Sequence, residues 1–316
     1  MDKDSKIYIA GGTGMVGSAI HRLLISKGYS NFVFTPFEHF DLTRQRVVEN
    51  FFKKEKPDVV VDAAAKVGGI LYNNTHRAEF LYENLMIQSN IIHESYNSNV
   101  ERLLFLGSSC IYPKLAPQPM EEKLLLTGLL EPTNEPYAVA KIAGIKLCEN
   151  YFRQYGCNFI SVMPTNLYGQ NDNYDQHSGH VIPALIAKIH KAKEQNESSV
   201  AAWGTGNARR EFMYVDDLAD ACVFILESVD AEELYNQDVT HINIGTGEDI
   251  TIRELVKVIS RIIGYDGAIE YEIDKPDGTP QKLLNVERLD KLGWTFKTKL
   301  TEGIQLAYHH YLSSLN

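Results

Sequence analysis

Two residues in the middle of the chain, Tyr137 and Lys141, have the types and the spacing of an acid–base pair. They stand four residues apart in a segment that predicts a helix to about Tyr155, so both side chains lie on one helix face. A free tyrosine has a pKa of about 10, and a neighbouring ammonium group lowers it by favouring the phenolate. The pair indicates proton exchange with a carbonyl oxygen, although the same spacing also occurs in ordinary exposed helices.

A second group of reactive side chains, Ser108, Ser109 and Cys110, follows an apolar run at 103–106. That run and the glycine after it predict a buried strand that ends in a turn. In an open parallel α/β sheet, ligands bind at the carboxyl ends of the strands. A serine hydroxyl there would hydrogen-bond the oxygen that Tyr137 protonates while a hydride reaches the carbon. The two segments together predict a site that reduces a carbonyl group.

A glycine-rich loop near the N-terminus predicts the source of that hydride. Residues 6–10 predict a strand, residues 18–28 predict a helix, and Gly11, Gly14 and Gly17 lie between them. This spacing and context are typical of a dinucleotide site, with a tight turn, a close approach of the backbone to the pyrophosphate and close packing of the helix. We assign the cofactor to the whole loop: Gly11, Gly12, Thr13, Gly14, Met15, Val16 and Gly17.

The choice between NAD and NADP depends on the end of the second strand, expected at 31–35. An acidic residue there binds a ribose 2′-hydroxyl, and an arginine binds a 2′-phosphate. The sequence has neither directly after the strand; Thr35 and His39 favour a phosphate, and Glu38 favours NAD. The residues alone leave both cofactors open.

The remaining pattern predicts an α/β fold, a doubly wound parallel sheet of the Rossmann type with a smaller, interleaved C-terminal substrate domain. Further strands are expected at 57–62 and 159–163, and a strand and turn at 241–247. Further helices are expected at 47–56, 84–97, 180–195, 252–263 and 300–312. Another helix is expected to start with an aspartate N-cap at 215–219, after a loop that holds Arg209 and Arg210. We place the dinucleotide-binding domain at 1–169 plus 211–248 and the substrate domain at 170–210 plus 249–316.

Composition excludes several classes of function. The 316 residues are 44% hydrophobic and carry a formal net charge of −10, which argues against non-specific nucleic-acid binding. No apolar run approaches the length of a membrane span, and from the polar residues at the N-terminus we expect no signal peptide. The four cysteines (Cys110, Cys148, Cys157 and Cys222) lack metal-type spacing, so we expect no metal, no membrane partner and a reducing cytoplasm.

Several motifs together resemble the extended short-chain dehydrogenase/reductases that act on nucleotide sugars. They are the glycine loop, the Ser108/Tyr137/Lys141 set, and the stretches at 215–219 and 243–247. Within that family, the stretches at 63–69, 106–113, 164–169 and 275–280 closely resemble the subgroup that converts GDP-4-keto-6-deoxy-D-mannose to GDP-L-fucose. The resemblance covers residues 7 to about 311.

The resemblance implies two half-reactions at one site: epimerisation at C3 and C5, then reduction of the C4 ketone with NADPH. Cys110 and His180 would move the ring protons, because a thiol and an imidazole can both titrate near neutral pH. Ser108 would orient the keto oxygen, and Lys141 would also contact the nicotinamide ribose. We assign Pro164, Asn166, Leu167 and His180 to cofactor contacts as well.

On the substrate side, the resemblance to an enzyme of GDP-sugars directs attention to cations, an aromatic ring and a carboxylate. Arg210 and Lys188 are the candidates for the pyrophosphate, Trp203 for packing on the sugar or base, and Asp277 for accepting hydrogen bonds. The ordinary alternative is that the charged side chains among these residues are solvent-exposed surface groups and that the tryptophan packs in the core. The expected partner is a small GDP-sugar. We also expect a homodimer through the helices at 84 and 137, with outward apolar residues Ile142, Ile145 and Leu147.

The sequence departs from the subgroup at the cofactor site and leaves rival functions open. The glycine loop and the second strand end lack the arginines that the subgroup places beside a 2′-phosphate, so discrimination against NADH is open while NADPH is favoured. A 4-epimerase or a 4,6-dehydratase of the same family is the alternative function; a dehydratase would have threonine and glutamate where Cys110 and Ile111 stand. A non-catalytic cofactor-binding sensor is disfavoured, because both Tyr137 and Lys141 are present.

Overall fold

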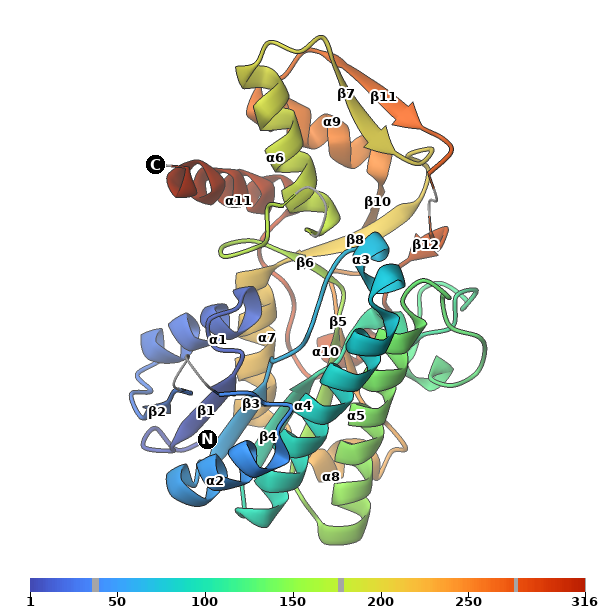
Figure 1. Cartoon of the computed structure of the whole chain (residues 1–316). Helices are drawn as coiled ribbons and strands as arrows, with labels where there is room; N and C mark the ends of the chain where they lie inside the picture. The colour runs from blue at the N-terminus through green and yellow to red at the C-terminus, as the bar shows by residue number, and fades with distance from the viewer. Residues whose placement is uncertain (36–39, 176–178, 276–277, 316) are drawn as a thin grey trace.

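The computed structural model describes residues 1–35, 40–175, 179–275 and 278–315. Its lower half is a six-stranded sheet in the order β2-β1-β3-β4-β5-β9, in which every neighbouring pair is parallel (Figure 1). The strands are β1 (Ile7–Ala10), β2 (Phe32–Val33), β3 (Val59–Asp62), β4 (Arg102–Leu106), β5 (Phe159–Pro164) and β9 (Ile242–Ile244). The predicted doubly wound parallel sheet is confirmed.

Helices cover both faces of this sheet, which is why its strands are apolar on both sides. One face packs on α1 (Met15–Ser26) and α7 (Val215–Ser228), and the other on α2 (Gln45–Glu55), α4 (Arg77–Asn97) and α5 (Glu135–Tyr155). In β3 the alternation is clear, because Val59 and Val61 lie in the first core cluster and Val60 lies in the second.

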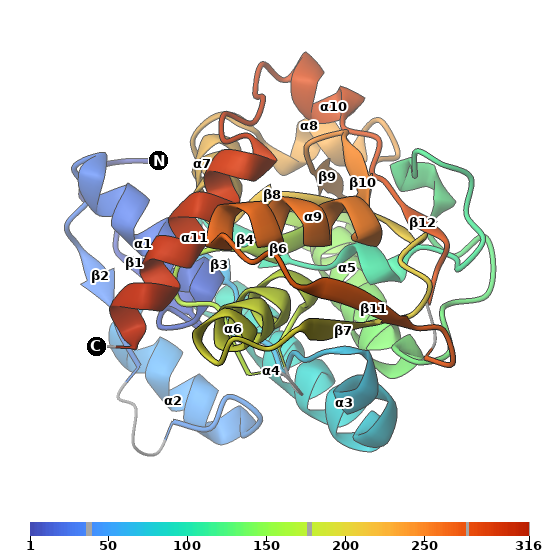
Figure 2. The ribbon, with the colours of Figure 1, turned by 90° about the horizontal axis from the view of Figure 1, so that it is seen from above.

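The upper half of the molecule rests on the carboxyl ends of the sheet strands (Figures 1 and 2). It contains a third core cluster, built largely from the buried sides of three helices and two small sheets. The helices are α6 (Val181–Glu194), α9 (Ile252–Ile263) and α11 (Leu300–Ser314). The strands are β6 (Asn166–Tyr168), β7 (Ser199–Trp203), β8 (Arg209–Tyr214), β10 (Asp249–Thr251), β11 (Ala268–Glu272) and β12 (Gln281–Lys282).

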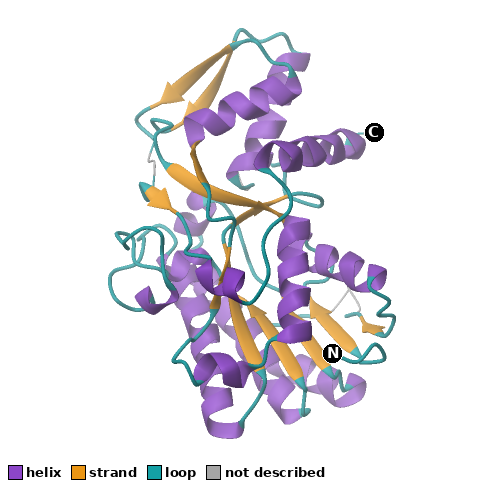
Figure 3. Ribbon diagram, turned by 180° about the vertical axis from the view of Figure 1, so that it is seen from behind, coloured by secondary structure: helices purple, strands orange, loops and turns teal. Residues whose placement is uncertain are grey.

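Three short α-helices also lie in the described ranges, α3 (Ile70–Thr75), α8 (Ala231–Tyr235) and α10 (Glu287–Lys291), which are labelled in Figure 1. Figure 3 shows the same helices and strands from behind. None of the helices in the described ranges is long and apolar enough to cross a membrane. The division into two domains at residues 169, 210 and 248 remains our proposal.

The structure corrects several local expectations. The segment around Arg209 is strand β8, not a loop, because its backbone pairs with three other strands. The helix expected at 84 begins at Arg77. The N-cap of α7 is Tyr214 and not an aspartate. Asp217 lies inside the first turn of that helix, where its carboxylate instead accepts hydrogen bonds from the backbone of the segment before α11.

The prediction that Ile142, Ile145 and Leu147 form an outward face of α5 is also wrong for two of these three residues. Ile142 and Ile145 are 8% and 0% exposed and belong to the core beneath the helix. Leu147 is half-buried against the same core. The helix exposes Val139 and Tyr155 instead. Because α5 is buried along most of its length, the positions of its apolar residues do not show which of its faces is exposed to solvent.

Candidate active site

A cavity of about 820 Å³ lies along the carboxyl ends of β1, β3, β4 and β5. This is the edge of a doubly wound sheet at which ligands bind. The walls come from segments far apart in sequence, which the parallel order of the strands brings together. Every residue that we assigned to the cofactor from the sequence lines this cavity, as do Ser108, Tyr137 and Lys141.

The glycine loop has the shape of a cradle for a diphosphate. Gly11 has a φ of +76°, and a Cβ there would lie 2.8 Å from the carbonyl oxygen of Ala63. A Cβ on Gly17 would lie 2.3 Å from the carbonyl oxygen of Gly11, so only glycine lets α1 start this close to the loop. No side chain caps the N-terminus of α1, and its first amides therefore face the cavity as donors for an anion.

Ser108 and Cys110 meet at the end of β4. Ser108 is the N-cap of a single 3-10 turn (Ser109–Ile111), and the Cys110 thiol donates to its Oγ at 3.1 Å. Burial raises the pKa of the Cys110 thiol, while the positive charge of Lys282, the Ser108 hydroxyl and Lys141 act in the opposite direction. Cys110 itself is 6% exposed and lies behind Ser108 rather than in the cavity wall.

Tyr137 and Lys141 project from the first two turns of α5 into the same cavity. Lys141 Nζ donates to the Leu106 carbonyl at 2.8 Å and lies 5.8 Å from the centre of the Tyr137 ring. The expected lowering of the tyrosine pKa by lysine is not found in this arrangement, because burial raises the pKa of Tyr137. The phenol is consequently held in its protonated form, ready to donate.

His180 enters from the upper half of the molecule, at the N-terminus of α6. Its side chain does not cap the helix, and it lines the cavity opposite the sheet. The side chain of His180 is exposed to the cavity, and partial desolvation by the surrounding protein lowers its pKa, which favours the neutral imidazole. Cys110 and His180 thus approach the cavity from two different layers of the structure.

Three of the residues assigned to the substrate from the sequence, Lys188, Trp203 and Arg210, lie outside this cavity. Arg210 is on β8, where its neighbour Arg209 points the other way and forms an ion pair with Asp249 at 2.6 Å. Lys188 is two turns from His180 on α6, about 12 Å along the helix axis. Trp203 ends β7 and is 48% exposed, and Asp277 lies outside the described residues. Glu38 and His39, which we expected to follow the second strand, also lie outside the described residues.

Sequence reasoning missed one group beside the site, Lys282. The parallel pairing of β12 with β8 sets Lys282 directly opposite Arg210, so two cations share one side of that small sheet. Burial lowers the pKa of Lys282, the Arg210 charge lowers it further, and the nearby Cys110 opposes both. The local sequence around Lys282 does not indicate that it lies opposite Arg210, because β8 and β12 are about seventy residues apart and pair only in the folded chain.

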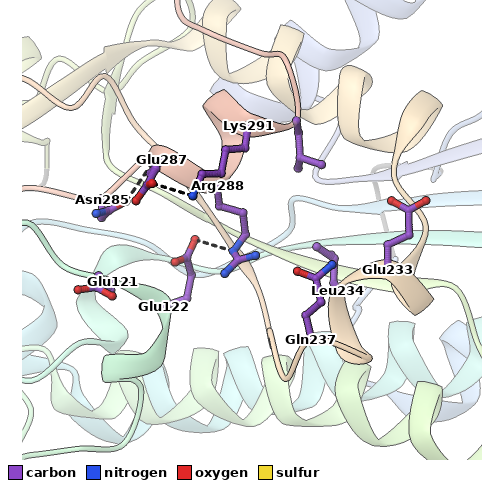
Figure 4. Close-up of a pocket in the computed structure, with 10 residues that line it drawn as sticks. Glu121, Glu122, Glu233, Leu234, Gln237, Asn285, Glu287, Arg288 and Lys291 are labelled. Carbon is purple, nitrogen blue, oxygen red and sulfur yellow. Dashed lines mark hydrogen bonds and ion pairs between the residues drawn. The ribbon is translucent and has the colours of Figure 1, made fainter.

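A second cavity, of about 310 Å³, lies away from this edge, between α8, α10 and the segment at 121–122 (Figure 4). Its walls are mainly charged, and Arg288 approaches Glu122 within it at 3.6 Å. It contains none of the residues assigned to the site from the sequence. We therefore place the chemistry in the cavity at the sheet edge.

Comparison with known proteins gives consistent matches over the whole chain. The profile of the NAD dependent epimerase/dehydratase family matches residues 7–245. The chain is 52% identical over 314 residues to GDP-L-fucose synthase 1 of Arabidopsis thaliana, covering 99% of this chain and 95% of that protein. It is also 52% identical over 311 residues to the GDP-L-fucose synthase of Escherichia coli (strain K12), covering 98% and 97%.

A solved structure gives the same picture at the level of the fold. The chain is similar to a GDP-mannoheptose C4 reductase from Campylobacter jejuni with NADP bound, with a TM-score of 0.90 and 40% identity. The match covers 99% of both chains. Both halves of the molecule, and not the Rossmann sheet alone, are therefore shared with a solved structure.

Proposed function

We infer the function from the family to which the chain belongs, the NAD dependent epimerase/dehydratase family. The chain is an NADPH-dependent epimerase/reductase of a GDP-sugar. It epimerises GDP-4-keto-6-deoxy-D-mannose at C3 and C5 and then reduces the C4 ketone, which gives GDP-L-fucose. We propose roles in these two half-reactions for the individual residues of the site.

The cofactor is NADPH, and the glycine loop fits its diphosphate because Gly11 and Gly17 let α1 start directly behind the loop, where no side chain caps the first amides of the helix. When bound, NADPH supplies the hydride that reduces C4. The first amides of α1 would hold the diphosphate, and Lys141, on the wall of the same cavity, would contact the ribose next to the nicotinamide.

For reduction, we assign Tyr137 as the acid that protonates the C4 oxygen. Its raised pKa suits that role, because a proton donor must hold its proton until the hydride arrives. Ser108 would hold the same oxygen through a hydrogen bond. Lys141, held by the Leu106 carbonyl, would stabilise negative charge on Tyr137 after the transfer. During epimerisation the same donors would stabilise the enolate oxygen, so one site serves both half-reactions.

For epimerisation, Cys110 and His180 are the proposed pair that removes and returns ring protons. The observation that carries this assignment is the 3.1 Å hydrogen bond from the Cys110 thiol to Ser108, which places the thiol beside the group that orients the ketone. His180 lies across the cavity on another layer. Inversion at a ring carbon needs a proton donor and a proton acceptor on opposite sides. We propose that His180 acts from the cavity wall and that Cys110, which lies behind Ser108, acts from the sheet side.

The GDP moiety is proposed to lie toward the upper half, against Arg210 and Lys188. Lys188 lies two turns along α6 from His180, so the pyrophosphate would follow the sugar along that helix. Trp203 would pack on the sugar or base, and Asp277 is kept as a proposed hydrogen-bond acceptor. Two neighbouring cations, Arg210 and Lys282, repel each other, and an anionic substrate between them would relieve that repulsion.

We also propose a cytoplasmic homodimer formed through α4 and α5. These two helices expose Tyr82, Val139 and Tyr155, and the Tyr155 ring stacks on Tyr96 with centres 4.3 Å apart. Rigid aromatic side chains of this kind are enriched in protein interfaces. All four cysteines are free thiols, which suits a reducing compartment.

The test is oxidation of NADPH with GDP-4-keto-6-deoxymannose in deuterated water, followed by analysis of deuterium at C3 and C5 of the product. We expect oxidation together with deuterium at both carbons. Cys110→Ser should lose the exchange, whereas the matched variant Cys157→Ser, at the opposite end of β5, should keep it. If neither NADPH nor NADH is oxidised, the assignment fails, and GDP-mannose and UDP-sugars become the next substrates.

A further inference from the structure

A buried carboxylate beneath the cavity has no role in the reaction described above. Asp62 is the last residue of β3 and is 0% exposed. Its Oδ1 accepts a hydrogen bond from the backbone of Ala64 at 3.3 Å, and its Oδ2 has no hydrogen-bond partner among the described residues. An ionisable group this deep, without a full set of hydrogen-bond partners, costs folding free energy, so its presence calls for an explanation.

The register of the sheet places Asp62 on the same face of the sheet as the proposed catalytic lysine. Asp62 is directly opposite Phe105 on β4, and the alternation of β3 turns both side chains toward the face covered by α4 and α5. Lys141 Nζ lies over the Phe105 ring, 4.7 Å from its centre. The carboxylate and the ammonium group therefore flank the same phenylalanine on one side of the sheet.

Each of the two groups supplies what the other lacks. Lys141 is 3% exposed, and its ammonium group donates a hydrogen bond to a neutral carbonyl. Within the described ranges, the hydrogen-bond partner of that ammonium group is the Leu106 carbonyl, and no carboxylate forms an ion pair with it. Asp62 and Lys141 attract each other through a desolvated environment, where such an attraction extends beyond direct contact.

We propose that Asp62 is a positioning residue that acts through Lys141: its buried negative charge keeps the lysine protonated and sets the proton affinity of the Tyr137–Lys141 pair. This inference rests on the proposed function, since it assigns Tyr137 and Lys141 to the reaction. It adds a group that neither touches substrate nor lines the cofactor cavity.

The charge on Asp62 itself depends on pH. Burial raises the pKa of Asp62 to about 6, although Lys141 and the Ala64 amide act against the rise. Two other titratable groups face it: Tyr8 from β1 and Cys148 from α5, and burial raises the pKa of both, so they are neutral near pH 7. Lys141 is thus the cation that responds to Asp62, and the coupling operates above about pH 6 and fades below it.

The direction of the pKa change caused by Asp62→Asn is the same whether the proton is held by Lys141 or by Tyr137. Removing a negative charge lowers the proton affinity of every group near it, so Asp62→Asn lowers the pKa of Lys141 and, while the lysine stays charged, that of Tyr137. Either change moves the alkaline limb of the pH–rate profile to lower pH. We expect a shift of about one pH unit or more, which corresponds to a loss of about tenfold in kcat on that limb.

The first experiment compares the pH dependence of kcat for NADPH oxidation in wild type, Asp62→Asn and Asp62→Glu. We expect the Asn profile to fall below wild type on the alkaline side and to converge with it below about pH 6, where wild-type Asp62 becomes protonated. The Glu variant should retain the wild-type limb, because it retains the charge. A purely structural role would lower kcat by one factor at every pH, and such parallel profiles would overturn the proposal.

A second measurement tests the coupling without any turnover, so its outcome is independent of the proposed function. Infrared titration, with the Asp62→Asn spectrum subtracted, reports protonation of the Asp62 carboxyl alone. We expect its midpoint to rise by about one pH unit or more in Lys141→Met, because the opposing charge is gone. An unchanged midpoint would overturn the proposal even if the enzyme is active. If the wild type is inactive but the Asp62 midpoint still shifts in Lys141→Met, only the proposed reaction is contradicted and the coupling stands.

Discussion

Replacing Lys282 by glutamine tests how the site makes a buried thiol useful for proton transfer. Burial raises the pKa of Cys110, and Lys282 is the foremost of the groups that act against that rise. Removing the cation therefore raises the thiol pKa further. A charge close to a buried group shifts its pKa by about one to three units, and we take one unit because Ser108 and Lys141 remain.

One unit corresponds to about a tenfold smaller thiolate fraction at any pH below the thiol pKa. At saturating substrate, exchange of deuterium into the carbon at which Cys110 is the base should fall by about tenfold at pH 7. Raising the pH by about one unit should recover the rate. The assay is the rate of deuterium incorporation, measured separately at C3 and C5 as a function of pH.

Two variants serve as controls. Lys282→Arg keeps the charge and should keep the pH dependence. Lys291→Gln removes a lysine that pairs with Glu287 at 2.7 Å and acts on neither Cys110 nor Lys282, so it should leave the exchange at the wild-type rate. Wild-type pH profiles at both carbons in Lys282→Gln would refute the reasoning, because the thiol would then be activated without that cation.

Three other substitutions probe the packing and the buried charges of the fold. Gly17→Ala places a Cβ 2.3 Å from the Gly11 carbonyl oxygen, and we expect a loss of about 1–3 kcal/mol in unfolding free energy together with NADPH affinity lowered at least tenfold, measured by urea unfolding and calorimetric titration. Glu211→Gln should destabilise by about 1–3 kcal/mol in urea, because the buried carboxylate accepts hydrogen bonds from three backbone amides of two other segments; wild-type stability would contradict this. Burial lowers the pKa of His241 from 6.5 to about 3, so the unfolded state binds the proton first and stability falls as pH drops from 6.5 toward 3. That fall amounts to about 1.4 kcal/mol per pH unit, and His241→Gln should remove this part of the slope in pH-dependent urea unfolding.

The lower half of the molecule could be predicted closely because its signals are local. The run before Gly11, the glycine spacing and the helix after it define a strand, a turn and a helix within thirty residues. Tyr137 and Lys141 lie on one face of α5 because helical geometry requires it. The order of strands and helices along the chain then limits the sheet to a parallel, doubly wound one.

The upper half was predicted less well because it is assembled from short strands paired at long range. β8 pairs with β6, β10 and β12. The pattern of apolar and polar residues within its six residues does not indicate which strands it pairs with. The sequence places two adjacent arginines in an expected loop, and of the two Arg210 alone is assigned to the pyrophosphate. Strand alternation separates them, with Arg209 tied to Asp249 and Arg210 set opposite Lys282.

The fold class, the cofactor loop and the set of reactive side chains all follow from the order of residues, since each depends on residues close together along the chain. The surroundings of those side chains come from the folded molecule alone. Folding puts Lys282 near Cys110 and Asp62 beside Lys141, and it buries Tyr137 so that its pKa rises. Charges act through space and desolvation depends on what covers a group, so the chemistry of each residue is set by neighbours that the order of residues does not reveal.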